Sequence, residues 1–143
     1  MSLGVSSNGG RWELTRRYGF AASHRLHSAD LSEAENDRVY GKCNNPFGHG
    51  HNYVLDVTLG GAPDAQTMMI VPREALDAFV AHEVLEAFDH RNLNEEVAVF
   101  RDAVPTTENL CIEIFRRLRA FPAARLVRVR IEETGNNTFE FSG

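Results

Sequence analysis

Apolar and polar residues alternate along two stretches in the first half of the chain, residues 12–24 and 49–59. A period of two is typical of a β-strand with one face buried. On the apolar side lie Trp12, Leu14, Tyr18, Phe20, Ala22, Tyr53, Leu55, Val57 and Leu59, with Arg16 as the one exception. The pattern therefore predicts two strands, and the apolar run at residues 68–71 is compatible with a continuation of the same sheet.

Two later stretches carry apolar residues at helical spacing. Pro72 suits the first turn of one helix, which we expect to end in a loop at residues 89–94. The other opens at residues 105–109, where a threonine can cap its amino end and Glu108 suits the positive end of the helix dipole. The two apolar stripes are Leu76, Phe79, Val80, Val84, Ala87 and Phe88, then Leu110, Cys111, Ile114, Phe115 and Leu118.

Alternation returns at residues 127–133, with Val127, Val129 and Ile131 on the apolar side. A turn at residues 135–137 leads to a last short strand, with Phe139 and Phe141 facing inward. Residues 28–42 are polar, and we expect a loop there with a short helical turn. Two strands, two helices and two more strands predict an α+β fold, a four-stranded antiparallel sheet with two helices on one face.

Length and composition indicate one domain over residues 11–143, preceded by a Gly/Ser-rich flexible tail at residues 1–10. The net charge of −5 offers no field for nucleic acid. No stretch reads as a signal peptide or membrane span, and two cysteines make no disulfide framework. These features favour a cytoplasmic protein that binds neither nucleic acid nor membrane.

Three histidines and a glutamate fall on the apolar side of their predicted strands, close to the strand ends. They are His24, His49, His51 and Glu133. A buried imidazole or carboxylate destabilises a fold unless it is paired or bound to a metal, so several together suggest a shared polar pocket. Zinc is the natural occupant of a three-histidine site with one open position. Taken singly, His24 is more often a hydrogen-bonded histidine, and Glu133 could form a strand-end salt bridge.

Cys43 lies just before the two histidines, across a turn at residues 44–48 that can fold it back towards them. Taken alone, a cysteine is more often a small buried apolar residue than a base or nucleophile. The pair Asp89 and His90 could simply end a helix, or the carboxylate could orient and charge the imidazole within a site. Thr106 and Thr107 are capping residues first and ligand contacts second.

Five short segments together resemble a known enzyme family. They are residues 20–26, 41–53, 89–93, 106–109 and 133–137, and their order along the chain also matches. The sequence is similar to the 6-pyruvoyl-tetrahydropterin synthases from the first predicted strand to the C-terminus. This resemblance implies a tunnelling fold, in which trimers close into a barrel and two trimers stack into a hexamer.

The resemblance also implies a reaction and a set of residue roles. The family converts 7,8-dihydroneopterin triphosphate into 6-pyruvoyl-tetrahydropterin and triphosphate, and its members bind Zn²⁺. Carried over by position, the zinc ligands are His24, His49 and His51, the proton-abstracting base is Cys43, its charge relay is Asp89 and His90, the pterin anchor is Glu133, and Thr106 and Thr107 lie near the pterin.

The spacing between Cys43 and His49 helps to separate related activities. Five residues lie between them, whereas the 6-carboxy-tetrahydropterin synthases of deazaguanine biosynthesis usually have three. The longer loop favours the pyruvoyl enzyme, and the carboxy reaction is the alternative because both start from the same substrate. Dihydroneopterin aldolase shares the fold class but lacks this zinc constellation. A non-enzymatic, zinc-stabilised assembly module leaves Cys43 without a role unless it is a fourth ligand.

Overall fold

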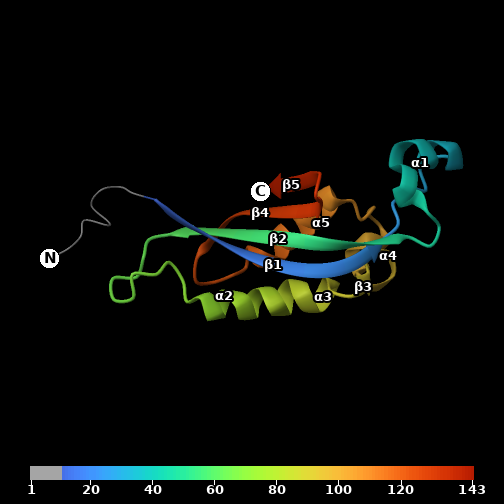
Figure 1. The fold of residues 1–143 in the computed structure, drawn as a ribbon. Helices are drawn as coiled ribbons and strands as arrows, with labels where there is room; N and C mark the ends of the chain where they lie inside the picture. The colour runs from blue at the N-terminus through green and yellow to red at the C-terminus, as the bar shows by residue number, and fades with distance from the viewer. Residues whose placement is uncertain (1–10) are drawn as a thin grey trace.

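The computed structural model describes residues 11–143, so the tail expected at residues 1–10 lies outside the described part of the chain. Four long strands pair antiparallel, as the alternation predicts. They are β1 (Trp12–His24), β2 (His49–Gly61), β4 (Arg125–Thr134) and β5 (Asn137–Phe141). A fifth strand, β3 (Arg91–Asn92), pairs parallel with β1 and gives the order β3-β1-β2-β4-β5 (Figure 1). The sheet is therefore mixed and five-stranded, and not four-stranded and antiparallel as expected. The sequence does not predict β3, because a strand of two residues shows no periodicity.

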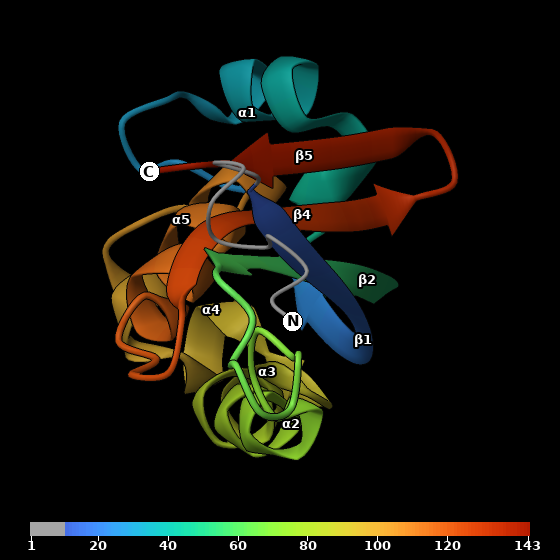
Figure 2. The same cartoon turned by 90° about the vertical axis from the view of Figure 1, so that its left-hand side faces the viewer.

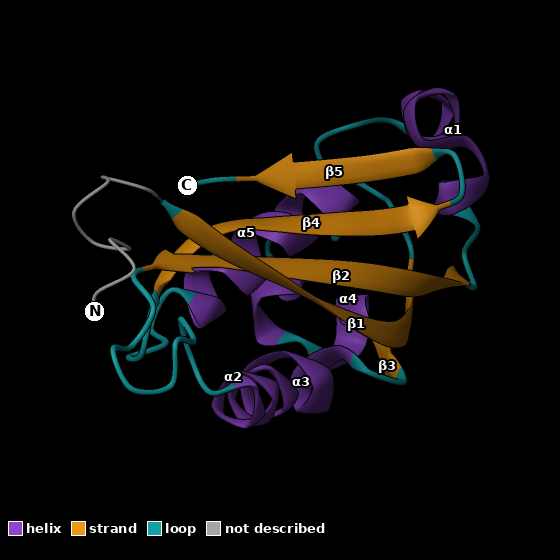
Figure 3. Cartoon of the chain, turned by 60° about the vertical axis from the view of Figure 1, so that its left-hand side comes forward, coloured by secondary structure: helices purple, strands orange, loops and turns teal. Residues whose placement is uncertain are grey.

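The two helices expected from apolar stripes are present and pack on one face of the sheet. The first is α2 (Arg73–Val80), which continues through the π-helical turn η2 (Ala81–Leu85) into α3 (Glu86–Phe88). The second is α5 (Thr107–Leu118), which Thr106 caps by accepting the backbone N–H of Asn109. Figures 2 and 3 show α2 and α3 beside β1 and α5 against β4 and β5. The core between these layers contains Phe20, Tyr53, Leu55, Val57, Leu76, Val80, Val84, Phe88, Leu110, Ile114, Leu118, Val129 and Ile131.

Four short helices were not foreseen as such. They are α1 (Glu33–Tyr40), the 3₁₀ helices η1 (Gly41–Asn44) and η3 (Ala98–Arg101), and α4 (Leu93–Glu96). The helical turn expected within residues 28–42 extends to the eight residues of α1. Ser32 and Glu35 cap its amino end reciprocally, and Asn36 is its one buried residue. A helix without an apolar stripe carries no periodic signal, which is why the sequence understates it.

Two expectations about the sheet are wrong in detail. Residues 68–71 form a loop instead of a strand, although Val71 is buried in the core. Pairing of β2 with β4 shifts register between Thr58 and Leu59, so Leu126 is buried and Val127 is only half-buried. A β-bulge of this kind inserts one residue and reverses the inside–outside parity beyond it. Within residues 11–143, no helix is long and apolar enough to cross a bilayer.

Candidate active site

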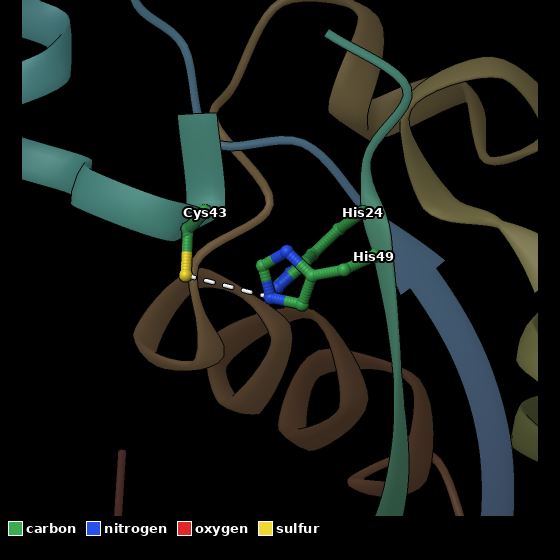
Figure 4. A group of neighbouring side chains, drawn as sticks. All are labelled: His24, Cys43 and His49. Atoms are coloured by element: carbon green, nitrogen blue, oxygen red, sulfur yellow. Dashed lines mark hydrogen bonds between the residues drawn. The ribbon is translucent and has the colours of Figure 1, made fainter. Parts of the chain in front are cut away.

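The pairing of β1 with β2 brings three histidines together. His24 ends β1 directly opposite His49, which begins β2, and His51 lies opposite Ala22. The Nε2 atom of His51 is 2.9 Å from Nε2 of His49 and 3.1 Å from Nε2 of His24. The parity argument for a shared face is therefore confirmed by the structure, and Figure 4 shows two of these rings with Cys43.

The environment of His24 fixes which ring nitrogen is free. The ring is fully buried, and its Nδ1 lies 2.9 Å from the carbonyl oxygen of Pro105. A carbonyl only accepts, so Nδ1 carries the proton and Nε2 presents a lone pair to the other histidines. Burial lowers the pKa of His24 and of His51. Both rings are thereby held in the neutral form that a metal ion requires.

The arrangement fits a metal ion better than a hydrogen-bonded cluster. Each Nε2 has one in-plane position, for a proton or for a lone pair, so that of His51 cannot bond well to both neighbours. Ligand nitrogens about 2.0–2.1 Å from a tetrahedral zinc ion lie roughly 3.3 Å apart, close to the spacing observed. These residues could therefore hold zinc through three Nε2 atoms.

Cys43 lies beside this cluster on η1, the 3₁₀ turn before the loop at residues 44–48. Its Sγ is 3.5 Å from Nε2 of His49 (Figure 4). His24, Cys43 and His49 form one group of potential metal ligands within 4.8 Å, and His24, His51 and Glu133 form another. Burial raises the pKa of the Cys43 thiol, and the nearby negative charge of Glu133 raises it further. Among residues 11–143, no cationic group offsets these two effects on the thiol pKa.

Glu133 reaches the same site from the end of β4. Its carboxylate accepts a hydrogen bond from the hydroxyl of Thr107, which is itself buried. Thr106 uses its hydroxyl as the helix cap. Neither threonine lines the cavity at this site, so the place of both beside the pterin stays a prediction. In this structure, Thr107 positions Glu133.

A cavity of about 960 Å³ opens over the site. Its lining includes Cys43, His49, His51 and Glu133, and also Arg25, His27 and Lys42. His27 was not foreseen, because no pattern distinguishes it from a surface histidine. The Pro105 carbonyl could not be foreseen either, since it is a backbone group 81 residues away from His24.

Asp89 and His90 bond to the backbone of β1 and do not line that cavity. The Asp89 carboxylate accepts the backbone N–H of Ala21, and the His90 N–H donates to the Ala21 carbonyl. The His90 side chain is 83% exposed and borders a separate cavity of about 500 Å³. Its φ of 59° is left-handed, which is uncommon for a residue other than glycine. The pair is adjacent, at 3.7 Å, but one chain does not bring it to Cys43's cavity.

Comparison with known proteins agrees with this geometry. Residues 13–143 match the family model described as 6-pyruvoyl tetrahydropterin synthase. The chain is 44% identical over 131 residues to the 6-pyruvoyl tetrahydrobiopterin synthase of Poecilia reticulata, covering 91% of this chain and 89% of that one. It is 41% identical over 132 residues to the synthase of Homo sapiens, covering 92% and 91%.

A solved structure extends the agreement to three dimensions. The 6-pyruvoyl tetrahydropterin synthase of Caenorhabditis elegans superposes with a TM-score of 0.89 at 41% identity, over 94% of this chain and 96% of that one. Sequence and fold thus match over nearly the whole of both chains. Together with a histidine cluster, a thiol and a carboxylate around one cavity, this likeness shows that the chain belongs to the 6-pyruvoyl tetrahydropterin synthase family, a family of lyases.

Proposed function

We propose that this protein converts 7,8-dihydroneopterin triphosphate into 6-pyruvoyl-tetrahydropterin and triphosphate. The observation that carries the proposal is the convergence of the Nε2 atoms of His24, His49 and His51 beside Cys43, at a cavity that His49, His51 and Cys43 line. Family membership supplies the reaction class, and the geometry supplies groups suited to each part of it.

The proposed roles follow from the chemistry of the substrate side chain, which must lose protons from carbons that bear hydroxyls. A zinc ion held by the three histidines would act as a Lewis acid towards those hydroxyl oxygens. Cys43, on the rim of the histidine cluster, takes the proton as general base. Its thiolate form requires positive charge nearby, because burial alone raises its pKa.

Glu133 suits the role of pterin anchor. A carboxylate accepts paired N–H donors as charge-assisted hydrogen bonds, and Thr107 holds one of its oxygens in place. In the lining of the cavity, Arg25, His27 and Lys42 offer positive charge or N–H donors for a polyanionic tail. Glu33 and Asp37 of α1 line the same cavity, so its lining carries charge of both signs.

An oligomer would complete this site. One chain leaves Cys43 and His90 in separate cavities, and His90 is almost fully exposed. The predicted charge relay therefore requires His90 and Asp89 from a second copy. We propose a trimer or a hexamer in the barrel arrangement of the tunnelling fold.

Product analysis tests the proposed reaction. The purified protein would be incubated with zinc and 7,8-dihydroneopterin triphosphate, and the products identified by mass spectrometry. We expect 6-pyruvoyl-tetrahydropterin together with inorganic triphosphate. A 6-carboxy-tetrahydropterin product would favour the alternative activity, against which the five-residue loop before His49 argues. Absence of any product from a zinc-loaded protein would favour a structural metal site.

A further inference from the structure

Residues 25–28 follow β1 and join the site to α1. They belong to no helix or strand, so their backbone groups make no regular ladder of hydrogen bonds. Backbone groups of this 25–28 segment are bonded instead by the side chains of three asparagines. Each comes from a different helical element: Asn94 from α4, Asn44 from η1 and Asn36 from α1. Buried or half-buried backbone polar groups destabilise a fold when they are left unpaired, so these amides hold the segment in one conformation.

Asn94 makes two hydrogen bonds to the backbone of Arg25, the residue immediately after His24. The Arg25 N–H donates to Oδ1 of Asn94 at 2.7 Å, and Nδ2 of Asn94 donates to the Arg25 carbonyl at 2.9 Å. β3 pairs with β1 at Ala22 and Ser23, and the same register continued by two residues places Asn94 opposite Arg25. The amide therefore acts as a substitute for the next peptide group of the sheet.

Cys43 is attached to the same segment one residue further on. The Leu26 N–H donates to the Cys43 carbonyl at 2.7 Å, and Nδ2 of Asn44 donates to the Leu26 carbonyl at 2.8 Å. The distance between His24 and Cys43 is therefore set through two consecutive residues of the segment. A shift of the backbone at Arg25 would change the positions of both His24 and Cys43.

Asn36 makes the same type of clamp at the far end. The Ser28 N–H donates to its Oδ1 at 2.8 Å, and its Nδ2 donates to the Ser28 carbonyl at 3.0 Å. Asn36 is fully buried, so its bonds stabilise α1 and the end of the segment. Ser28 lies four residues beyond His24, and the Asn36 side chain bonds to Ser28, Leu31 and Ser32 and to none of the three histidines.

We propose that Asn94 is a positioning residue of the metal centre, because its amide fixes the backbone next to His24 and through it the direction of the His24 ring. Asn36 clamps the same segment but serves stability alone. The inference rests on the proposed function, since it takes the three histidines as metal ligands.

Metal affinity separates positioning from stability. Asn94→Ala and Asn36→Ala would be compared with the wild type by competition with a chelator for Zn²⁺, and by the visible absorption of the Co²⁺-substituted proteins. Asn94→Ala removes two side-chain hydrogen bonds and Asn36→Ala removes four, so both should lower the unfolding midpoint by roughly 2–8 °C, and Asn36→Ala by more. Only Asn94→Ala should weaken zinc binding, by about 10–100-fold, and alter the cobalt spectrum.

A conservative variant guards against simple unfolding of Asn94→Ala. Asn94→Gln keeps both polar groups but displaces them by about one methylene, so it should fold and still bind zinc more weakly than the wild type. Wild-type affinity in Asn94→Gln and in a folded Asn94→Ala would overturn the inference and leave the proposed function intact. Equal loss of affinity in Asn36→Ala would overturn it too. Failure of the wild type to bind zinc would overturn both the inference and the metal centre.

Discussion

Gly48 shows how a single residue sets the geometry of the histidine cluster. Its φ is +71°, and a Cβ atom there would lie 2.9 Å from the His24 carbonyl oxygen and 3.3 Å from the carbonyl carbon. Glycine therefore lets the loop at residues 44–48 pass directly over the end of β1. His49 follows at once, so the close approach places the first ring of β2 against His24.

Gly48→Ala should consequently destabilise the fold by roughly 1–3 kcal/mol and also weaken zinc binding, because both backbone strain and the clash act beside two of the proposed zinc ligands. Chelator competition and chemical denaturation would measure the two effects. Gly41→Ala is a matched control: its φ is +55°, but a Cβ there meets nothing within 4 Å. It should lose stability through strain and keep its metal affinity, and an equal loss of affinity in both variants would contradict this account.

Thr107 should act on substrate through Glu133. Thr107→Val keeps the shape of the side chain and removes the hydroxyl that holds the carboxylate. We expect a rise in KM of about fivefold to tenfold, corresponding to a lost hydrogen bond of roughly 1–1.5 kcal/mol, with kcat and zinc content unchanged. Steady-state kinetics would measure this. A fall in kcat with unchanged KM would place Thr107 in the chemical step instead.

At the residue scale, the sequence could predict the groups that strand parity reveals. His24, His49, His51 and Glu133 stand out because each is polar on an apolar face. Pro105 does not stand out, because its contribution is a backbone carbonyl that only the folded chain brings to His24. The hydrogen bonds of Asn36, Asn44 and Asn94 are hidden for a similar reason, since a carboxamide in a polar segment without apolar periodicity has no pattern that identifies its partner.

At the scale of the elements, Arg117 of α5 contacts the helix that leads to Asp89. Glu113 on α5 is 5% exposed and bonds to Arg116 and Arg117. Arg117 lies over the Phe88 ring at 4.8 Å and donates to the Glu83 carbonyl of the π-helical turn. One carboxylate thus orients the arginine that ties α5 to the helix leading to Asp89.

Glu113→Gln should lower the free energy of unfolding by about 2 kcal/mol at neutral pH, since charge-assisted bonds become neutral ones. Burial raises the pKa of Glu113, but the hydrogen bonds and charges of Arg116 and Arg117 together outweigh it and lower that pKa from its usual 4.5. Its contribution is therefore fully present above about pH 4.5 and is lost as pH falls through the lowered value. Denaturation of both proteins between pH 7 and pH 3 would show the difference shrinking. A difference independent of pH would contradict the ionic role.

Elements that bury an apolar stripe were predictable, and those that bury none were not. The stripes of α2 and α5 gave both helices, whereas α1 buries only Asn36 and was understated. β3 owes its existence to pairing with β1 at Ala22 and Ser23, and two residues carry no local preference that could announce it.

At the scale of the whole molecule, both edges of the sheet formed by residues 11–143 are open. β5 pairs only with β4, and β1 is covered on its outer side by β3 at Ala22 and Ser23 alone. Unpaired strand edges favour association, and closure into a barrel removes them. The α+β fold class could be predicted, because it follows from the patterns within one chain. Assembly could not, because it depends on contacts between copies that no single chain displays.

We expect a homo-oligomer in multiples of three, which light scattering at micromolar concentration would detect. Association would also explain the exposed His90 ring beside its own small cavity. A variant with His90→Ala should keep its oligomeric state and its zinc while losing turnover. A stable monomer with full activity would contradict both the assembly and a site shared between copies.

The most direct test of this account is the metal content of Cys43→Ala, measured together with its turnover. If three histidines hold the ion and Cys43 is the base, the variant should keep zinc and bind substrate, with turnover lower by on the order of 10²–10⁴-fold. His49→Ala, as the control, should lose zinc and activity together. A Cys43→Ala protein that is stripped of zinc, or one that is fully active, would contradict the separation of metal and base.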